Sequence, residues 1–284
     1  MLRHHTLTVS KHLKQETTIK TLDDIEFPKI LYKYRDWNNE YNKRFITERE
    51  VFMASPNQFE DKLDCKSPVR YDLMTAEQAK VVYTRISNYD ENLSRQQKRK
   101  RVRELLNKKD YLNPEMNENY QKIYFKGYFE RLGILSLTAE NCLDAMWEKY
   151  AENHSGFCVG YNSRILFNFL GGGGKVEYPN ELPILLPDPI MSREEMRWKQ
   201  VYFKEKKWKF EKEYRTQKFW EHPASISDRQ ISLPKEAFNC IILGKNMNES
   251  DRKEIIDAIK SKIGNIEIKE HKNVCQQSTV VKNK

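Results

Sequence analysis

The segment from Trp208 to Arg215 brings aromatic rings, two carboxylates and a guanidinium close together in the sequence W-K-F-E-K-E-Y-R. Its strict alternation predicts a strand over residues 211–218, with Glu211, Glu213 and Arg215 on one side. A carboxylate beside an oxocarbenium-like centre stabilises developing positive charge, and an arginine can bind phosphate through two hydrogen bonds. Glu213 and Glu211 are therefore candidate catalytic residues and Arg215 a candidate phosphate ligand. A solvated strand face with ion pairs accounts for the pattern equally well.

An earlier segment, ILYKYR, raises a similar choice. As a strand it places Tyr32 and Tyr34 on one face and Lys33 and Arg35 on the other. The tyrosines could stack on a base or a nicotinamide ring, and Arg35 could bind phosphate. Two buried core tyrosines are the more common outcome of such a pattern.

Two further groups of residues favour structural roles. Asp61 and Asp64 could share a helical face and bind a hard cation, but an Asx cap next to Ser and Pro is the better interpretation. Trp147, Tyr150 and His154 fall on one stripe of a predicted helix, which is typical of core packing.

Several kinds of site are not supported by the sequence. Four consecutive glycines, Gly171 to Gly174, lack the spacing of a phosphate-binding loop and predict a flexible loop. The six histidines have no metal-site spacing with cysteine, so no metal is predicted. Glu267 and Lys269 form a Glu-x-Lys pattern that suits a metal-dependent nuclease, but this alternative requires a further aspartate, and Asp188 lies in a proline-rich loop.

The net charge of +9 favours polyanionic partners, and much of it lies in one run. A non-catalytic nucleic-acid-binding module built on a basic helix over residues 95–109 is a second hypothesis. The solvated face of a helix capped by Ser94 explains the run more simply. The candidate nucleic-acid-binding residues are Arg95, Lys98, Arg99, Lys100, Arg101 and Arg103.

Alternating strand and helix signals predict an α+β fold with a single mixed-sheet domain over residues 21–270. A helical insertion is expected over 75–130, and residues 1–20 and 271–284 are expected to be loosely ordered termini. Strands are predicted at 30–35, 51–54, 134–138, 156–161, 175–178, 211–218, 239–244 and 266–269, and helices also at 37–47, 141–152, 192–200 and 249–263.

The composition and the ends of the chain bear on its environment. No apolar stretch approaches the roughly 20 residues that span a bilayer, so no membrane partner is expected. The five cysteines are odd in number and form no CxxC pair. They are expected to be reduced thiols in a cytoplasmic protein.

The ordered set of segments LYKYR, FMASPNQFEDKLDC, ILSLT, WEKYAENHSGFCVGYN, WKFEKEYR and IILG resembles the bacterial family named domain of unknown function 2971. The resemblance runs over roughly residues 28–270. It implies an intracellular effector of a mobile element or an anti-phage defence system. A fainter likeness to ADP-ribosyltransferase-like toxins implies an early strand that contacts the nicotinamide end of NAD and a late strand that supplies a glutamate.

Together these observations predict an effector that acts on a nucleotide or nucleic acid, with NAD as substrate for ADP-ribosyl transfer or cleavage. Glu213 would stabilise the ribosyl cation with Glu211 as helper. Tyr32 and Tyr34 would stack on the ring, and Arg35 or Arg215 would bind phosphate.

Overall fold

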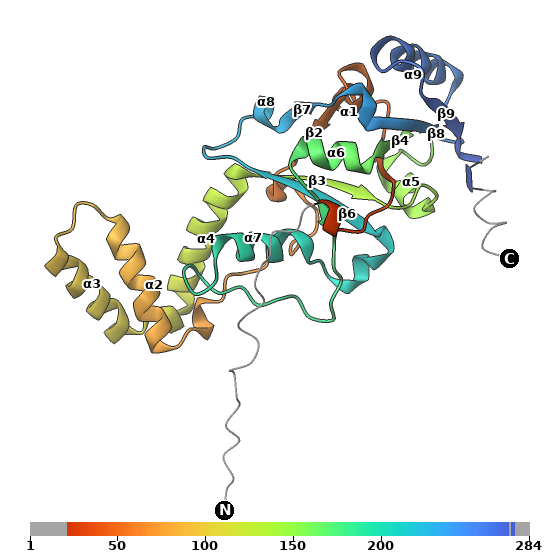
Figure 1. Ribbon diagram of the computed structural model, residues 1–284. Helices are drawn as coiled ribbons and strands as arrows, with labels where there is room; N and C mark the ends of the chain where they lie inside the picture. Colours follow the sequence, from red (N-terminus) through yellow and green to blue (C-terminus); the bar gives the residue numbers. More distant parts are fainter. Residues whose placement is uncertain (1–21, 273, 276–284) are drawn as a thin grey trace, which may run out of the picture.

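The computed structural model describes residues 22–272 and 274–275 (Figure 1). A seven-stranded mixed sheet with the order β5-β6-β3-β1-β4-β8-β9 forms the centre, and β2 and β7 form a separate two-stranded sheet. The predicted α+β fold with one sheet domain is therefore confirmed. The strands are β1 Ile30–Arg35, β2 Glu50–Phe52, β3 Leu132–Thr138, β4 Phe157–Asn162, β5 Gly174–Lys175, β6 Glu213–Phe219, β7 Gln230–Ser232, β8 Phe238–Leu243 and β9 Glu267–Glu270.

Helices cover both faces of the large sheet. On one face α1, α6 and α9 pack over a core that includes Phe45, Phe167 and Ile255. On the other face Trp147 of α5 packs on Tyr34, while Val201 of α7 packs near Leu132. The α-helices are α1 Glu40–Thr47, α2 Ala76–Tyr89, α3 Arg95–Lys108, α4 Pro114–Arg131, α5 Asp144–Tyr150, α6 Ser163–Leu170, α7 Arg193–Tyr202, α8 Ile226–Arg229 and α9 Glu249–Lys262.

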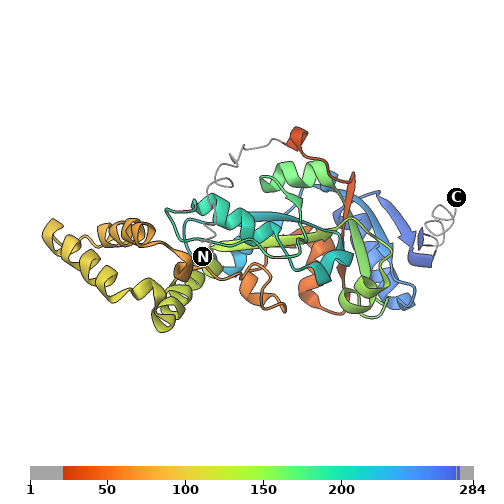
Figure 2. The same ribbon diagram turned by 90° about the horizontal axis from the view of Figure 1, so that it is seen from below.

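The predicted helical insertion forms an arm in which α2 and α3 project from the sheet domain (Figures 1 and 2). Ser94 caps α3 as predicted, because its side chain accepts a hydrogen bond from the Gln97 backbone amide. Val102 is buried against a small core shared with α2, which includes Val82 and Tyr83. The arm therefore has its own hydrophobic contacts and carries its basic residues outward.

The structure bears on two further expectations, the loosely ordered chain ends and the glycine run at 171–174. The expectation of loosely ordered ends falls outside the described residues for 1–20, 273 and 276–284, whereas residues 271–272 and 274–275 are helical. Gly171, the first residue of the glycine run, ends α6 in the left-handed region at φ 87°, a conformation that glycine adopts without strain.

The expectation that all cysteines are reduced thiols is wrong for one pair. Cys142 and Cys275 form a disulfide across 133 residues of sequence. Cys65, Cys158 and Cys240 are free and buried. Within residues 22–272 and 274–275, no helix is both long enough and apolar enough to cross a bilayer.

Candidate functional site

The candidate site lies where two neighbouring strands of the central sheet separate. Strand β1 pairs with β4 along its whole length, from Ile30 to Arg35. Its pairing with β3 on the other side is limited to Tyr32 opposite Thr138. The two strands therefore open a gap within the sheet, and a cavity of about 230 Å³ occupies it.

Side chains replace the missing ladder hydrogen bonds at this gap. The Lys33 ammonium donates to the Ser136 carbonyl oxygen of β3 at 2.6 Å, and the Arg35 guanidinium donates to the Tyr34 carbonyl at 3.1 Å. Buried main-chain carbonyls require such partners, since leaving them unpaired is costly. The basic residues of β1 thus have a structural role and also lie at the cavity.

The cavity has walls from several elements. A loop after the 3-10 helix η2 Pro56–Gln58 contributes Phe59 and Asp61, and α5 contributes Tyr150. A second 3-10 helix, η5 Lys206–Glu211, contributes Trp208. The remaining lining residues that bear charge or an aromatic ring are Tyr32, Lys33, Tyr34, Arg35, Glu60, Asp64, Lys149, Lys204, Glu211 and Glu213.

A buried cluster of charges forms the base of the cavity. Glu213 accepts hydrogen bonds from Arg215 at 2.7 Å and 2.9 Å, so this pair is bidentate. Arg215 also donates to Asp64 at 2.8 Å. Lys204 binds Glu211 at 2.6 Å and Glu213 at 3.1 Å. Three carboxylates are therefore held by two cations, and the group carries a formal excess of one negative charge.

The two glutamates of this cluster have opposite pKa shifts. Burial disfavours the Glu213 carboxylate, but Arg215 and Lys204 outweigh this effect and lower the pKa of Glu213 to about 2. Burial raises the pKa of Glu211, and Lys204 offsets this only in part. Pairs of carboxylates whose environments separate their pKa values often divide acid and base roles. Glu213 therefore stays ionised near neutral pH, whereas Glu211 is the group suited to exchange a proton.

The two carboxylates also differ in how many of their oxygens are already hydrogen-bonded. Both oxygens of Glu213 are engaged by Arg215, and one of them also by Lys204. For Glu211, Oε2 binds Lys204, while Oε1 accepts no hydrogen bond from the described residues. Glu211 can therefore accept a proton or a hydrogen bond from a ligand without breaking an ion pair.

Lys33 is a third titratable group at the cavity. Burial, together with the neighbouring Arg35, holds the pKa of the Lys33 ammonium well below its usual range. Burial also lowers the pKa of Arg35 to about 10, and its Nε is buried without a hydrogen-bond partner among the described residues. One N–H group of Arg35 is thus unpaired among the described residues, although it is buried next to the cavity.

The structure corrects the predicted strand over residues 211–218. The strand β6 begins at Glu213, and residues Lys206–Glu211 form the 3-10 helix η5. Lys212 joins the two with φ 44°, in the left-handed region. The predicted alternation therefore holds for Glu213, Tyr214 and Arg215 but fails before Lys212, where the chain leaves the edge of β3.

The side chains of Arg215 and Tyr34, both predicted to contact a ligand, are almost completely buried. Arg215 is fully buried and also donates to the Val201 carbonyl at 2.8 Å, so the structure places it beneath the cavity. Tyr34 is packed edge-on against Trp147 with ring centroids 5.1 Å apart, and its hydroxyl donates to the Glu140 carbonyl. Trp147 is fully buried, which confirms its predicted core role. Tyr32 is only half-buried, and Tyr150 of α5 is a second accessible ring.

Lys204 and Asp64 are essential parts of the cluster that the sequence analysis did not assign to it. Lys204 follows α7 in an irregular segment with no periodic pattern. Asp64 was considered only as a cation ligand, and it pairs with Arg215 and Lys204 instead. The neighbouring Asp61 accepts a hydrogen bond from the Leu63 amide, which confirms the predicted cap.

The other predicted sites lie apart from the cavity. The six basic candidates from Arg95 to Arg103 are on α3, where all but Lys98 are largely exposed. Glu267 and Lys269 pair with each other on the edge strand β9. Asp188 pairs with Arg85 of α2 and Arg193 of α7, and these helices lie away from β9 (Figure 1), so Asp188 does not join Glu267 and Lys269.

The buried Glu213 predicts a characteristic loss of stability in acid. Its pKa of about 2 in the folded state is below the ordinary value of 4.5, so its stabilisation is present above pH 4.5 and lost as the pH falls toward 2. We expect the free energy of unfolding to drop by about 3 kcal/mol over this range from Glu213. Denaturant unfolding at several pH values checks this. Glu213→Gln should lose this part of the pH dependence, whereas Glu236→Gln, at an exposed position, should keep it.

Comparison with known proteins does not place the chain in a family. No model of a known protein family matches the sequence, and neither the curated proteins nor the solved structures contain a significant match. The assignment of function therefore rests on the residues of the site.

Proposed function

We propose that the chain is an enzyme that cleaves the nicotinamide–ribose bond of NAD, either by hydrolysis or by ADP-ribosyl transfer to an acceptor. The observation that carries this proposal is the cavity between β1 and β3, where Glu211 and Glu213 meet accessible aromatic rings and cationic side chains. The likeness to ADP-ribosyltransferase-like toxins implies this reaction class, and the resemblance to domain of unknown function 2971 bears on the biological setting. It suggests a role as an effector in bacterial defence or a mobile element.

The size of the cavity supports binding of one end of the dinucleotide. Pockets for whole drug-sized ligands measure about 300–1,000 Å³, and this cavity of about 230 Å³ is smaller. It suits the nicotinamide ring and its ribose, with Tyr32 and Tyr150 beside the ring. The diphosphate would then lie beside Lys149, which is exposed, while Arg35 supplies positive charge from within the cavity wall.

The reaction assigns different tasks to the two glutamates. The bond from ribose C1′ to the ring nitrogen breaks, and neutral nicotinamide leaves with the electron pair. The oxocarbenium-like centre is stabilised by the negative cluster of Glu211, Glu213 and Asp64. Water or an acceptor hydroxyl then attacks C1′ and gives its proton to Glu211. Compared with the sequence-based assignment, Glu211 becomes the catalytic residue and Glu213 the positioning residue that fixes Lys204 and Arg215.

Turnover of NAD tests this proposal directly. The full-length protein is incubated with NAD labelled in the nicotinamide ring, and free nicotinamide is separated and counted over time. We expect release above the rate in buffer, with ADP-ribose or a modified acceptor as the second product. Absence of release in water and with protein, DNA and RNA acceptors would contradict the proposed function.

The projecting arm supports a second candidate function, which is binding of nucleic acid by α3. The helix α3 lies in the arm that projects from the sheet domain (Figure 2), and Arg99 and Arg103 line a groove together with residues of α2. Phosphate contacts of this kind depend strongly on salt. A nucleic acid bound by the arm could then serve as the acceptor for ADP-ribosyl transfer from the cavity of the same molecule.

Charge reversal on the arm measures this contribution. In Arg99→Glu/Arg103→Glu, we expect the affinity for a short DNA or RNA duplex to fall about 10- to 100-fold at low salt, with the salt slope reduced by about 2. Fluorescence anisotropy at several salt concentrations measures both. Lys253→Glu/Lys260→Glu makes the same charge change on exposed positions of α9 and should have a smaller effect. Equal effects of the two double variants would argue against a specific role of the arm.

A further inference from the structure

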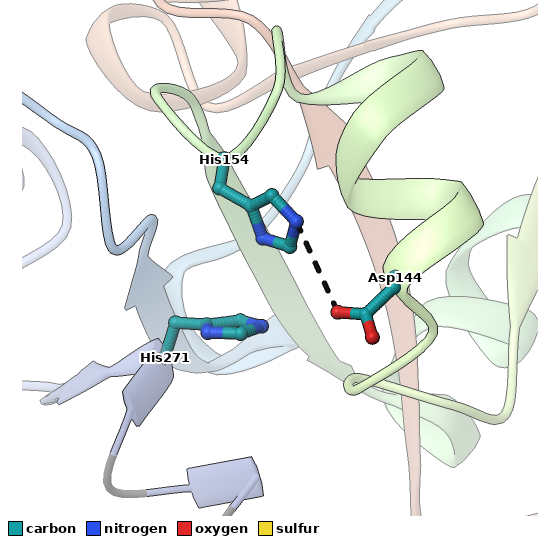
Figure 3. A group of neighbouring side chains, drawn as sticks. All are labelled: Asp144, His154 and His271. Atoms are coloured by element: carbon teal, nitrogen blue, oxygen red, sulfur yellow. Dashed lines mark ion pairs between the residues drawn. The ribbon is translucent and has the colours of Figure 1, made fainter.

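Three side chains from two distant parts of the sequence converge beside α5. Asp144 lies in the first turn of α5, His154 follows this helix, and His271 follows β9 (Figure 3). One potential ligand atom from each residue lies within 4.8 Å of the other two. The nearest atoms of His154 and Asp144, Nε2 and Oδ1, are 3.9 Å apart, which is too long for a hydrogen bond.

The two imidazoles are buried without the hydrogen bonds that burial normally requires. His154 is 5% exposed and His271 is 6% exposed. Nδ1 of His154 and both ring nitrogens of His271 have no hydrogen-bond partner among the described residues. Each unsatisfied buried polar group costs about 1–3 kcal/mol, so packing with Trp147 alone does not explain this arrangement.

The backbone around His154 is fixed in an unusual conformation. Glu152, Asn153 and His154 all have positive φ angles of 48°, 48° and 67°, which L-residues rarely adopt. The His154 amide donates to the Trp147 carbonyl at 3.3 Å, and its carbonyl accepts from the Asn246 amide at 2.9 Å. The imidazole is thus held in place from both sides of the turn.

Other contacts fix the second histidine and close off one side of the cluster. Trp147 stacks on His154 with ring centroids 5.8 Å apart and contacts His271 edge-on at 4.8 Å. The disulfide between Cys142 and Cys275 connects the segments that carry Asp144 and His271. Asp144 itself has a side chain that is 75% exposed, so the open side of the cluster faces solvent.

We propose that Asp144, His154 and His271 bind one Zn²⁺ ion, which joins the C-terminal segment to the first turn of α5. Two imidazole nitrogens and a carboxylate oxygen suit Zn²⁺ better than Mg²⁺ or Ca²⁺, which prefer oxygen ligands. Tetrahedral bonds of about 2.0–2.2 Å place ligand atoms about 3.4 Å apart, so the separations of 3.9 Å and up to 4.8 Å seen here must shorten by roughly 0.5–1.5 Å. Water would complete the four-coordinate shell on the exposed side.

Spacing along the chain gives no sign of this site, so no metal was expected from the sequence. His154 and His271 are far apart in sequence, and neither lies in a short metal-binding pattern with cysteine. The segment after β9 packs beside α5, and this tertiary contact brings the two histidines together. The proposed metal lies outside the cavity lining, so this inference does not depend on NAD cleavage.

Zinc binding is tested on the untagged full-length protein after removal of metals with a chelator. Calorimetric titration with Zn²⁺ should give one equivalent per chain, and Co²⁺ should give the visible absorption of a four-coordinate site. We expect His154→Ala and His271→Ala to weaken binding at least 100-fold and Asp144→Asn about 10-fold. Asp144 is exposed, so Asp144→Asn keeps the test informative if a histidine variant fails to fold.

Three control variants separate this site from other possible metal ligands in the chain. His222→Ala changes an exposed histidine, and His4→Ala/His5→Ala/His12→Ala removes those near the N-terminus; both should bind Zn²⁺ as tightly as the native chain. Cys142→Ser/Cys275→Ser should also retain the ion. No Zn²⁺ binding, equal binding by all histidine variants, or a sulfur-to-cobalt charge-transfer band would overturn the proposed site.

Discussion

Glu211→Gln is expected to slow the release of nicotinamide from NAD by about 100- to 1,000-fold, with a much smaller change in KM. The amide cannot accept the proton of the attacking water, and general base catalysis contributes about 10²–10⁴ to such reactions. The amide still fits the site, because Glu211 makes its one strong contact with Lys204. A loss confined to kcat would identify an interaction made in the transition state.

Two controls give this result its meaning. Glu194→Gln, on the exposed side of α7, should leave both constants unchanged. The dependence of kcat on pH should lose its acidic limb in Glu211→Gln, because burial raises the pKa of Glu211 in the native enzyme. Native activity in Glu211→Gln would exclude Glu211 as the base, even if NAD cleavage itself is observed.

Arg215→Met is expected to lower the free energy of unfolding by about 3–5 kcal/mol. The change removes the bidentate partner of Glu213 and the main partner of Asp64, and leaves both carboxylates buried with Lys204 as the remaining ion-pair partner among the described residues. Breaking a buried ion pair by removing one partner typically costs this amount. For a chain of this size, the melting temperature should fall by about 10 °C.

Calorimetry and denaturant unfolding measure this effect, and a second substitution tests its cause. Arg103→Met changes an exposed arginine of α3 and should alter stability by less than about 0.5 kcal/mol. Adding Asp64→Asn to Arg215→Met should restore part of the loss, because one uncompensated charge is removed. A loss below about 1 kcal/mol for Arg215→Met would show that the cluster tolerates an unpaired carboxylate.

The first strand and the helical insertion could be predicted from the sequence because their signals are local. The ILYKYR pattern gave β1 at Ile30–Arg35, and Ser94 and Pro114 mark the starts of α3 and α4. The contacts of Tyr34 with Trp147 and of Arg35 with Phe45 agree with the predicted opposite faces. Hydrophobic periodicity and capping residues carry this information without reference to the rest of the chain.

The candidate site could be predicted only in part, because tertiary contacts decide its composition. Glu211 and Glu213 were identified, but their spacing suggested two residues of one strand. Thr138 donates to the Glu211 carbonyl at 2.6 Å, and this contact accompanies the turn at Lys212 that ends the 3-10 helix. Lys204 joins the cluster from a segment without periodicity, so no local pattern indicated it. The short strands β2 and β7 were similarly hard to define, and β7 was not predicted.

The separation of β1 from β3 has a thermodynamic consequence for any ligand of the cavity. Since Lys33 satisfies the Ser136 carbonyl across the gap, a ligand group that draws the ammonium away removes one of the bonds between the two parts of the sheet. The free energy needed to widen this gap would lower the affinity for such a ligand. Conversely, a substitution that tightens contact between the strands would lower that affinity without touching the ligand. The affinity for a ligand and the distance between β1 and β3 are therefore thermodynamically coupled.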